Sequence, residues 1–321
     1  MTSNMITIIV CTYNRCDSLA KMLESVGQSI LPDSEPWEVL VVDNNSVDQT
    51  RAVVQKLCAR RPDRFRYLFE PRPGKSYALN SGIQEARGEI LVFTDDDVTV
   101  DPNWLQRLTA GLRSGECVGV GGRIVPQWSC APPPWLPSQE RHGLAPLVQF
   151  DLGTEAAPLA EPPFGANMAF HRKMFEKYGG FRTDLGPRPE GEVCKSEDVE
   201  FGARLLAAGE PLRYEPSALV HHLVQENRLR KNYFLKWWLD KARSDVRACG
   251  GATDAKWSLS GVPVHLFLRL AVWIARWMVS LDAARRFACK LTVWSLAGTI
   301  IESHRVWSAD RRKHVQPSSI T

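Results

Sequence analysis

Short apolar runs alternate with segments of helical periodicity along the first hundred residues. The apolar runs are rich in Val and Ile, and they span residues 6–10, 37–42, 65–69 and 89–94. The intervals between them have the three- and four-residue spacing of apolar side chains that is typical of helices, and they cover 16–29, 48–60 and 75–87. Uninterrupted apolar strands that are separated by helices indicate an α/β fold with a parallel sheet covered on both faces.

The next hundred residues continue with a less regular pattern. It predicts a helix over 102–114, a Gly-rich strand over 117–125, a strand over 164–170, a short helix over 172–178, a helix over 197–208 and a strand over 212–220. The Pro-rich stretch that ends near residue 163 predicts irregular structure, either an ordered loop or a lid on the acceptor side. Ser196 is the expected N-cap of the helix that follows it.

The last hundred residues are basic and aromatic, since seven of the eleven tryptophans follow Arg228. Helical periodicity covers 229–246 and 262–281, and the stretch 287–301 is mostly apolar. Arg269, Arg276 and Lys290 fall at multiples of seven, which predicts a narrow basic stripe on apolar helices. An interfacial membrane helix has this composition. The alternative is a helical subdomain that packs on the core or on a second subunit.

The composition and motifs of the chain argue against several classes of protein. The formal net charge of +4 gives no general case for binding nucleic acid. The eight cysteines include no CxxC pair, so we expect reduced thiols in a cytosolic compartment. The segment MTSNMITIIVCTYN has no basic n-region and no small-residue cleavage site, so we expect no secretory signal. No uninterrupted apolar stretch reaches the length of a simple spanning helix. No Gly-x-Gly-x-x-Gly follows the first strand, which argues against a dinucleotide-dependent oxidoreductase.

Polar clusters follow three of the predicted strands. They are Thr12-Tyr13-Asn14-Arg15, Asp43-Asn44-Asn45-Ser46 and Asp95-Asp96-Asp97. Because ligands bind beyond the carboxyl ends of the strands in such sheets, we expect these clusters to share one rim.

The three consecutive aspartates are typical of a divalent-cation site. Asp95 and Asp97 are two residues apart, so both carboxylates can point into the cleft while Asp96 faces elsewhere. Mg²⁺ and Mn²⁺ take oxygen ligands and share them with the phosphates of a substrate. The alternative is a turn or a helix cap, but a turn does not require three mutually repelling carboxylates.

Glu197 and Asp198 begin the helix that Ser196 precedes. Carboxylates in a first helical turn are stabilised by the helix dipole, which is a purely structural explanation. The same dipole keeps a carboxylate ionised, as a general base requires. The spacing alone leaves both explanations open.

Other polar residues at strand ends also have two explanations. Asp43 can accept a hydrogen bond from a nucleobase N–H or begin an Asx-turn. Lys75, in a Gly/Pro turn before a helix, can reach a diphosphate, although the Walker spacing is absent. His222, at the end of a strand, is a surface residue unless a metal lies beside it.

Together these segments resemble a family 2 glycosyltransferase of the nucleotide-diphospho-sugar transferase superfamily. The segments that carry the resemblance are ITIIVCTYNR, VLVVDNNSVDQT, RPGKSYALNSGIQEARGEILVFTDDDVTVDPNWL, FGANMAFHRKMFEKYGGF, SEDVEFGARLLAAG and YEPSALVHHLV. They cover residues 5 to 245 in the order and spacing of the family.

The resemblance implies a GT-A fold, a nucleotide-sugar donor, a divalent cation (Mn²⁺ or Mg²⁺) and inversion at the anomeric carbon. It places Asp95 and Asp97 at the ends of the metal-binding Asp-x-Asp signature, and His222 as a further metal ligand. It makes Asp198 the catalytic base. The remaining donor-side residues that it implies are Thr12, Tyr13, Arg15, Asp43, Lys75, Asn80, Asp95 and Asp96. On the acceptor and sugar side it implies Gly165, Ala166, Asn167 and Glu197.

The same resemblance divides the chain into a GT-A domain over 1–225 and a helical, Trp/Arg-rich extension over 226–321. Within the first, residues 1–100 form the nucleotide-binding half and 101–225 the acceptor half. The Gln-x-x-Arg-Trp signature of processive synthases is replaced by ENRLRKNYFLKWW, which favours transfer of a single sugar.

The expected partners are a UDP-sugar, by family frequency, and a hydroxyl acceptor that is lipid-linked. The expected place is the cytoplasmic face of the plasma membrane, in cell-surface polysaccharide or glycolipid assembly. Two alternatives remain, a nucleotidyltransferase of similar fold and a non-catalytic nucleotide-binding assembly protein. The CTYNR segment argues against the first because it lacks a Gly-rich phosphate loop, and the acidic motifs argue against the second.

Overall fold

The computed structural model of the protein describes residues 5–31, 35–136, 144–188, 196–249 and 257–315. These residues form two compact units. The sheet unit contains the described residues of 1–129, 147–189 and 197–224, and the helical unit contains those of 130–146, 190–196 and 225–321. The domain boundary at residue 225 stays a prediction, because the helical unit also includes residues that precede it.

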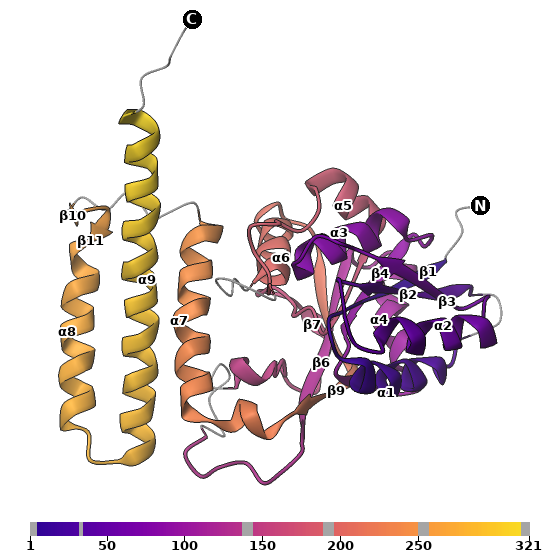
Figure 1. Ribbon diagram of the computed structural model, residues 1–321, viewed down its shortest axis with the longest axis horizontal. Coiled ribbons are helices and arrows are strands. Elements are labelled where there is room, and N and C mark those ends of the chain that lie inside the picture. Colours follow the sequence, from indigo (N-terminus) through magenta and orange to yellow (C-terminus); the bar gives the residue numbers. More distant parts are fainter. Residues whose placement is uncertain (1–4, 32–34, 137–143, 189–195, 250–256, 316–321) are drawn as a thin grey trace, which may run out of the picture. The chain divides into compact units, whose positions relative to one another are not determined.

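Nine strands of the described residues form one sheet in the sheet unit (Figure 1). They are β1 (Ile6–Thr12), β2 (Trp37–Asp43), β3 (Phe65–Phe69), β4 (Ile90–Asp95), β5 (Val98–Val100), β6 (Gly119–Trp128), β7 (Ala157–Pro158), β8 (Asn167–His171) and β9 (Leu212–Val224). Their order is β3-β2-β1-β4-β8-β6-β9-β5, with β7 paired to β9 beside this path. The first four strands are parallel, as predicted from their apolar runs.

The second half of the sheet is mixed. Strand β8 is antiparallel to β4 and β6, β9 is parallel to β6, and β5 is antiparallel to β9. Strand β5 was not expected, because three residues are too short to show a periodicity. The observed β9 extends four residues beyond the predicted end at 220, since its ladder with β6 continues to Val224 and that with β5 to His222.

Helices cover both faces of the sheet (Figure 1). They are α1 (Cys16–Gly27), α2 (Thr50–Arg60), α3 (Lys75–Glu85), α4 (Trp104–Arg113), α5 (Arg172–Tyr178) and α6 (Glu197–Ala207). Helices α1, α2 and α4 lie on one face, and α3, α5 and α6 lie on the other. This arrangement confirms the predicted α/β class.

The Pro-rich stretch is largely irregular where it is described, apart from a 3₁₀ turn (Ala145–Leu147) and β7. Residues 137–143 lie outside the described residues. The expected N-cap bond of Ser196 does not form: its hydroxyl makes no hydrogen bond among the described residues, and its backbone φ is +78°. The helix α6 therefore begins without a serine cap, contrary to the prediction.

A cluster of phenylalanines packs α5 and α6 against the sheet. Phe175 and Phe201 stack in parallel with ring centroids 4.4 Å apart, and Phe181 lies edge-on to Phe93 of β4 at 5.5 Å. Phe201 is fully buried, and it lies one helical turn after Asp198 on the same helix. Burial of this ring therefore fixes how α6 is rotated, and with it the direction of the first helical turn.

The helical unit contains three long helices, α7 (Lys231–Ala248), α8 (Val264–Val279) and α9 (Ala283–Val315). A 3₁₀ turn (Glu226–Leu229) precedes α7, and a small hairpin of β10 (Ser258–Leu259) and β11 (Val262–Pro263) precedes α8. Figure 1 shows α9 lying between α7 and α8. None of the described helices combines the length and apolar character that crossing a bilayer requires.

The prediction of one basic stripe is wrong for Lys290. The chain turns between Val279 and Ala283, so Lys290 belongs to α9 while Arg269 and Arg276 belong to α8. A seven-residue spacing keeps one face only within a continuous helix. Lys290 lies instead over the ring of Trp277, with its ammonium 5.4 Å from the centroid.

A buried carboxylate joins α7 to α9. Glu302 is 2% exposed and accepts hydrogen bonds from Arg243 at 2.9 Å and from Arg247 at 2.5 Å. Burial alone would raise the pKa of Glu302, but the two guanidinium groups outweigh it and lower the pKa below its ordinary value. The ion pairs therefore stabilise the helical unit at neutral pH.

We predict that Glu302→Gln lowers the free energy of unfolding of the helical unit by about 3 kcal/mol, because two partly buried arginines lose their counter-charge. Asp245→Asn is the matched control, since Asp245 pairs with Lys241 on the exposed side of α7 and its loss should cost under about 1 kcal/mol. Denaturant unfolding followed by circular dichroism measures both variants. Because the pKa of Glu302 is lowered, its contribution persists above about pH 4.5 and is lost as the pH falls further. A loss no larger than that of the control would contradict this account.

Candidate metal and donor site

The carboxyl ends of three parallel strands place polar residues along one rim of the sheet. In the register of the sheet, Thr12 of β1 lies beside Asp43 of β2, and Cys11 lies beside Asp95 of β4. Tyr13 follows Thr12 and is 39% exposed. The clusters that were expected to share one rim therefore do so.

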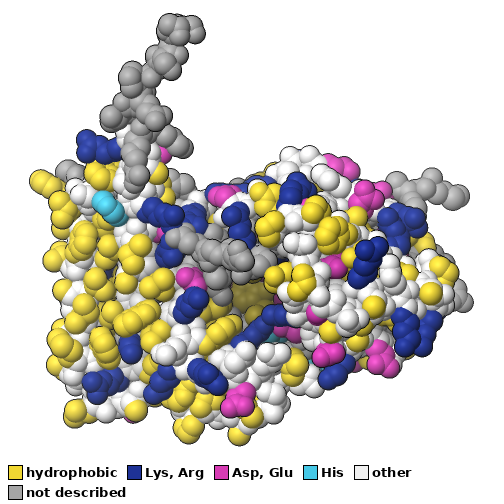
Figure 2. All heavy atoms as spheres, in the orientation of Figure 1, with side chains coloured by type: hydrophobic (Ala, Val, Ile, Leu, Met, Phe, Trp, Pro, Cys, Tyr) yellow, Lys and Arg dark blue, Asp and Glu magenta, His cyan; other side chains and the backbone are white. Residues whose placement is uncertain are grey.

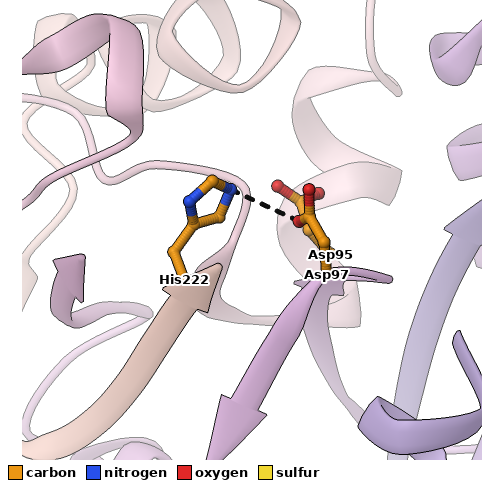
Figure 3. A group of neighbouring side chains, drawn as sticks. All are labelled: Asp95, Asp97 and His222. Atoms are coloured by element: carbon orange, nitrogen blue, oxygen red, sulfur yellow. Dashed lines mark ion pairs between the residues drawn. The ribbon is translucent and has the colours of Figure 1, made fainter. Parts of the chain in front are cut away.

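Asp95, Asp97 and His222 come together at this rim (Figure 3). One potential ligand atom from each lies within 4.8 Å of the others, and His222 Nε2 is 3.3 Å from Asp97 Oδ1. Asp97 and His222 are buried, and Asp95 is partly exposed. Two carboxylates and an imidazole at these separations match the donor set and spacing of a divalent cation, so the residues present fit such an ion.

The pairing of β5 with β9 brings the histidine to the aspartates. Val98 lies opposite His222 in this antiparallel ladder, and the backbone N–H of Leu223 donates to the carbonyl of Asp97 at 3.0 Å. His222 lies two residues before the end of β9, inside the strand. More than 120 residues of sequence separate the two partners, so no local pattern indicates their contact.

Two cations pair with the acidic cluster and balance part of its charge. Arg15 donates through one nitrogen to Asp96 at 2.9 Å and to Asp97 at 2.8 Å, and Lys75 donates to Asp95 at 2.6 Å. Burial alone would lower the pKa of Arg15 and of Lys75, but the neighbouring carboxylates hold both above their ordinary values. The placement of Arg15 beside a base or ribose stays a prediction, and in the structure Arg15 pairs with Asp96 and Asp97.

Asp96 is not part of the trio that could hold a metal ion. It is 5% exposed, and it accepts hydrogen bonds from the Thr12 hydroxyl at 2.7 Å and from Arg15. Burial raises the pKa of Asp96 to about 6, against the opposing charge of Arg15. These bonds tie the end of β1 to the acidic cluster, so Asp96 and Thr12 hold the rim together whether or not they contact a donor.

Lys75 also links the two acidic clusters. Its ammonium lies 2.6 Å from Asp95 and 3.8 Å from Glu197 of α6. Glu197 is 4% exposed, and burial raises its pKa to about 7, assisted by Asp198 and opposed by Lys75. One lysine therefore reaches carboxylates that are a hundred residues apart in the chain.

The backbone holds the carboxylate of Asp198 in place. The N–H of Gly165 donates to its Oδ2 at 2.6 Å, and the N–H of Val199 donates to its Oδ1 at 2.8 Å. A Cβ at position 165 would lie 3.1 Å from Asp198 Oδ2, so only glycine allows this close approach without displacing the carboxylate. Asp198 and Gly165 therefore form one unit beside the acidic cluster.

Several residues that the resemblance assigned to ligand binding form hydrogen bonds within the protein. Asn80 exchanges two hydrogen bonds with the backbone of Phe181, both at 2.8 Å. Asn167 is fully buried, and its amide bonds to the Trp104 indole and to two backbone carbonyls. Ala166 is buried and its carbonyl accepts from Thr94. Contacts of these three with a ligand stay untested, and the observed bonds give them a structural role.

Asp43 also has internal partners, namely the Ser46 N–H at 2.9 Å and the Tyr67 hydroxyl at 2.8 Å. The bond to Ser46 reaches three residues along the chain, one more than in the Asx-turn that was the alternative explanation for this residue. Each carboxylate oxygen keeps a second lone pair, so an additional N–H donor from a nucleobase is compatible with this geometry.

Asn44, to which no sequence pattern gave a role, shapes the turn before Lys75. Its buried amide donates to the carbonyls of Glu70 at 3.1 Å and Arg72 at 2.7 Å, and it accepts from the Gly74 N–H at 2.8 Å. Gly74 has φ +135°, a conformation that favours glycine. An asparagine among polar neighbours at a strand end gives no sign of such long-range bonds.

The family model described as "Glycosyl transferase family 2" matches residues 7–179, more than half of the chain. The chain belongs to glycosyl transferase family 2. It is therefore a glycosyltransferase, as the resemblance implied.

Two relatives of this family 2 glycosyltransferase match most of its length. The succinoglycan biosynthesis protein ExoM of Rhizobium meliloti is 30% identical over 70% of this chain and 68% of its own. The glucosyl-dolichyl phosphate glucuronosyltransferase of Haloferax volcanii is 28% identical over 73% and 74%. The names of these relatives indicate roles in polysaccharide and glycolipid biosynthesis.

Solved structures share the fold. The mannosyltransferase PcManGT of Pyrobaculum calidifontis, in complex with GDP-Man and Mn²⁺, gives a TM-score of 0.55 at 20% identity, over 98% of this chain and 76% of that one. S. aureus TarS 1-349 in complex with UDP gives 0.51 at 15% identity, over 100% and 94%. The predicted GT-A fold is confirmed.

We predict that Asn44→Ala destabilises the family 2 glycosyltransferase by about 2 to 3 kcal/mol, because three backbone groups lose a buried partner. Amide hydrogen exchange at Gly74 should accelerate in the same variant. Asn45→Gly is the control, since Asn45 is exposed with φ +67° and glycine accepts that conformation. Equal effects of the two substitutions in denaturant unfolding would refute the role given to Asn44.

Proposed function

We propose that the protein is an inverting, metal-dependent glycosyltransferase that moves one sugar from a nucleotide-diphospho-sugar to an acceptor hydroxyl. The observation that supports this best is the shared rim of the sheet. It carries a cation-ligating trio, Asp95, Asp97 and His222, and Lys75 links it to the Glu197–Asp198 pair. A donor diphosphate and an attacking hydroxyl need these two kinds of group side by side.

The donor nucleotide occupies the ends of β1 and β2 in this proposal. The exposed ring of Tyr13 offers a surface for the base, and Asp43 accepts one of its N–H groups. The ammonium of Lys75 and the guanidinium of Arg15 face the diphosphate and balance its charge. We propose UDP as the nucleotide; TarS was solved with UDP and PcManGT with GDP-Man, so the fold accepts either.

Asp95, Asp97 and His222 would hold the divalent cation, and such an ion would supply positive charge beside the leaving diphosphate. Mg²⁺ prefers an all-oxygen shell, whereas Mn²⁺ also accepts an imidazole nitrogen. The presence of His222 in the trio therefore favours Mn²⁺. The complex of PcManGT contains the same ion.

Asp198 is the base in this mechanism. Two backbone N–H groups hold its carboxylate at a fixed orientation, so that it accepts the proton of the acceptor hydroxyl as that oxygen attacks the anomeric carbon. Attack from the face opposite the diphosphate inverts the configuration. Glu197 is buried against Lys75 and keeps that cation between the two acidic clusters.

We propose a lipid-linked acceptor and a role in cell-surface polysaccharide or glycolipid assembly at the cytoplasmic face of the plasma membrane. The name of the Haloferax relative contains a dolichyl phosphate, and that of a 35% identical Campylobacter jejuni relative, over 29% of this chain and 29% of its own, contains a diphospho-undecaprenol. The absence of the processive signature around residues 226–238 favours transfer of a single sugar.

Thermal-shift screening against UDP-, GDP- and dTDP-sugars, with Mn²⁺, with Mg²⁺ and with EDTA, tests the donor and the metal together. We expect one nucleotide class to raise the melting temperature by several degrees with Mn²⁺, which follows from ligand binding at many times its Kd. EDTA should remove most of that shift. Equal stabilisation with and without metal would refute a metal-dependent site, and no shift by any nucleotide would refute the donor assignment.

We expect Asp198→Asn to lower kcat by a factor of about a thousand while donor binding is unchanged, because a general base contributes roughly that much. Asp97→Asn should instead weaken Mn²⁺ binding, measured by calorimetry. Glu200→Gln is the control in the first turn of the same helix, since Glu200 pairs with Arg204. Near-normal turnover by Asp198→Asn would end its assignment as the base.

A further inference from the structure

Helix α8 exposes one continuous apolar face. Eight consecutive positions around the helix are apolar and exposed, and together we call them the α8 face: Val264, Phe267, Leu268, Ala271, Val272, Ala275, Met278 and Val279. At about 100° per residue they fill an arc of roughly 140°. Leu268 is 65% exposed, Met278 67% and Val279 74%, and Leu281 in the following turn is fully exposed. Figure 2 shows hydrophobic side chains gathered over α8 at the left of the view.

The opposite side of α8 already has its partner within the helical unit. Leu266, Leu270 and Trp273 pack with Leu296 and Ile300 of α9. The α8 face is thus an additional apolar surface and not the side that holds the helix in place. A surface of this extent on a folded protein marks a contact with another apolar phase or molecule.

Basic side chains border the α8 face. His265, Arg269 and Arg276 are exposed and lie next to each other along one edge of the arc. Between residues 257 and 301 the chain has five arginines and lysines and one acidic residue, Asp282. The guanidinium of Arg276 lies 4.9 Å from the Trp273 ring, so tryptophan and arginine occur side by side at this edge.

The same edge borders an apolar cavity of about 1050 Å³ in the helical unit. Trp238 of α7, Trp273 of α8 and Leu291 of α9 line its walls, and Arg276 and Arg285 lie among them. An apolar cavity beside arginines suits an amphiphile, whose phosphate pairs with the cations while its chain contacts the apolar wall.

We propose that the α8 face docks onto the surface of an anionic lipid bilayer, with α8 lying in the plane of the interface. Sixteen residues of helix measure about 24 Å, short of the roughly 30 Å of a hydrocarbon core, so the helix lies on the bilayer and does not cross it. Tryptophan and arginine take the positions that they occupy at membrane interfaces. The cationic edge attracts anionic headgroups.

A second copy of the chain is a poorer occupant of the same face. In a two-fold dimer each face meets its own copy, which offers the cationic edges no acidic partner surface. Asp282 is the one acidic residue near them in the sequence, and it cannot balance five basic ones. Charge complementarity therefore favours lipid over self-association. The inference rests on the helical unit alone and goes beyond the proposed glycosyl transfer, which names no surface for membrane contact.

Vesicle flotation with the full chain tests the docking. The vesicles consist of phosphatidylcholine alone, or of phosphatidylcholine with about a third phosphatidylglycerol. We expect flotation with the anionic vesicles and a partition coefficient that is about tenfold or more lower for Leu268→Glu/Val272→Glu, because two side chains lose their apolar contact. Ile30→Glu, at a 57% exposed apolar position of the sheet unit, is the matched control and should float like the wild type.

A charge variant separates the electrostatic part. Arg269→Ala/Arg276→Ala should bind anionic vesicles no better than neutral ones, and raised salt should have the same effect on the wild type. Circular dichroism confirms that each variant is folded. Unchanged flotation of Leu268→Glu/Val272→Glu overturns the proposal. The proposal is also overturned if the wild type is a dimer, the Leu268→Glu/Val272→Glu variant is a monomer and neither protein floats with vesicles. Flotation requires no turnover, so its outcome is independent of the donor screen.

Discussion

The antiparallel pairing of β5 with β9 is the constraint on which the site depends. It is a short ladder, and it sets Val98 opposite His222 so that the imidazole lies against Asp97. The backbone bond from Leu223 to the carbonyl of Asp97 fixes the same alignment. A slip of one residue would turn His222 to the other face of the strand and leave two carboxylates without their nitrogen partner.

The rim concentrates negative charge that the protein only partly neutralises. Arg15 and Lys75 balance some of the five carboxylates in the two acidic clusters, and Glu197 keeps a raised pKa because burial still disfavours its charged form. A cation and a donor diphosphate would complete this balance, the first against the aspartates and the second against the lysine and arginine. Like-charge groups that cost folding free energy are characteristic of ligand sites and not of structural cores.

Different interactions stabilise the helical unit. A buried Glu302 with two arginines joins α7 to α9, and tryptophans with nearby cations line α8 and α9. The side of α8 that contacts α9 provides its packing in the unit, so folding does not require the apolar α8 face. Folding free energy alone gives no reason to keep such a face, whereas contact with lipid does. The proposed catalysis and the proposed membrane attachment thus concern separate units and have separate tests.

Much of the fold followed from the sequence, because apolar periodicity and strand-end polar clusters are local patterns. The four parallel strands, the helices between them and the shared rim with Asp95, Asp97 and Asp43 were predicted in this way. The family motifs gave Asp198 its role as base, which stays a prediction. Only the tertiary structure decided the rest. Strand β5 is too short to leave a periodicity, and the bonds of Asn44 and Asn80 join segments that are dozens of residues apart. The turn that separates Lys290 from Arg276 also breaks a spacing that looked continuous. Local patterns record which face of an element is buried, whereas the partners of a buried polar side chain depend on which elements the fold brings side by side.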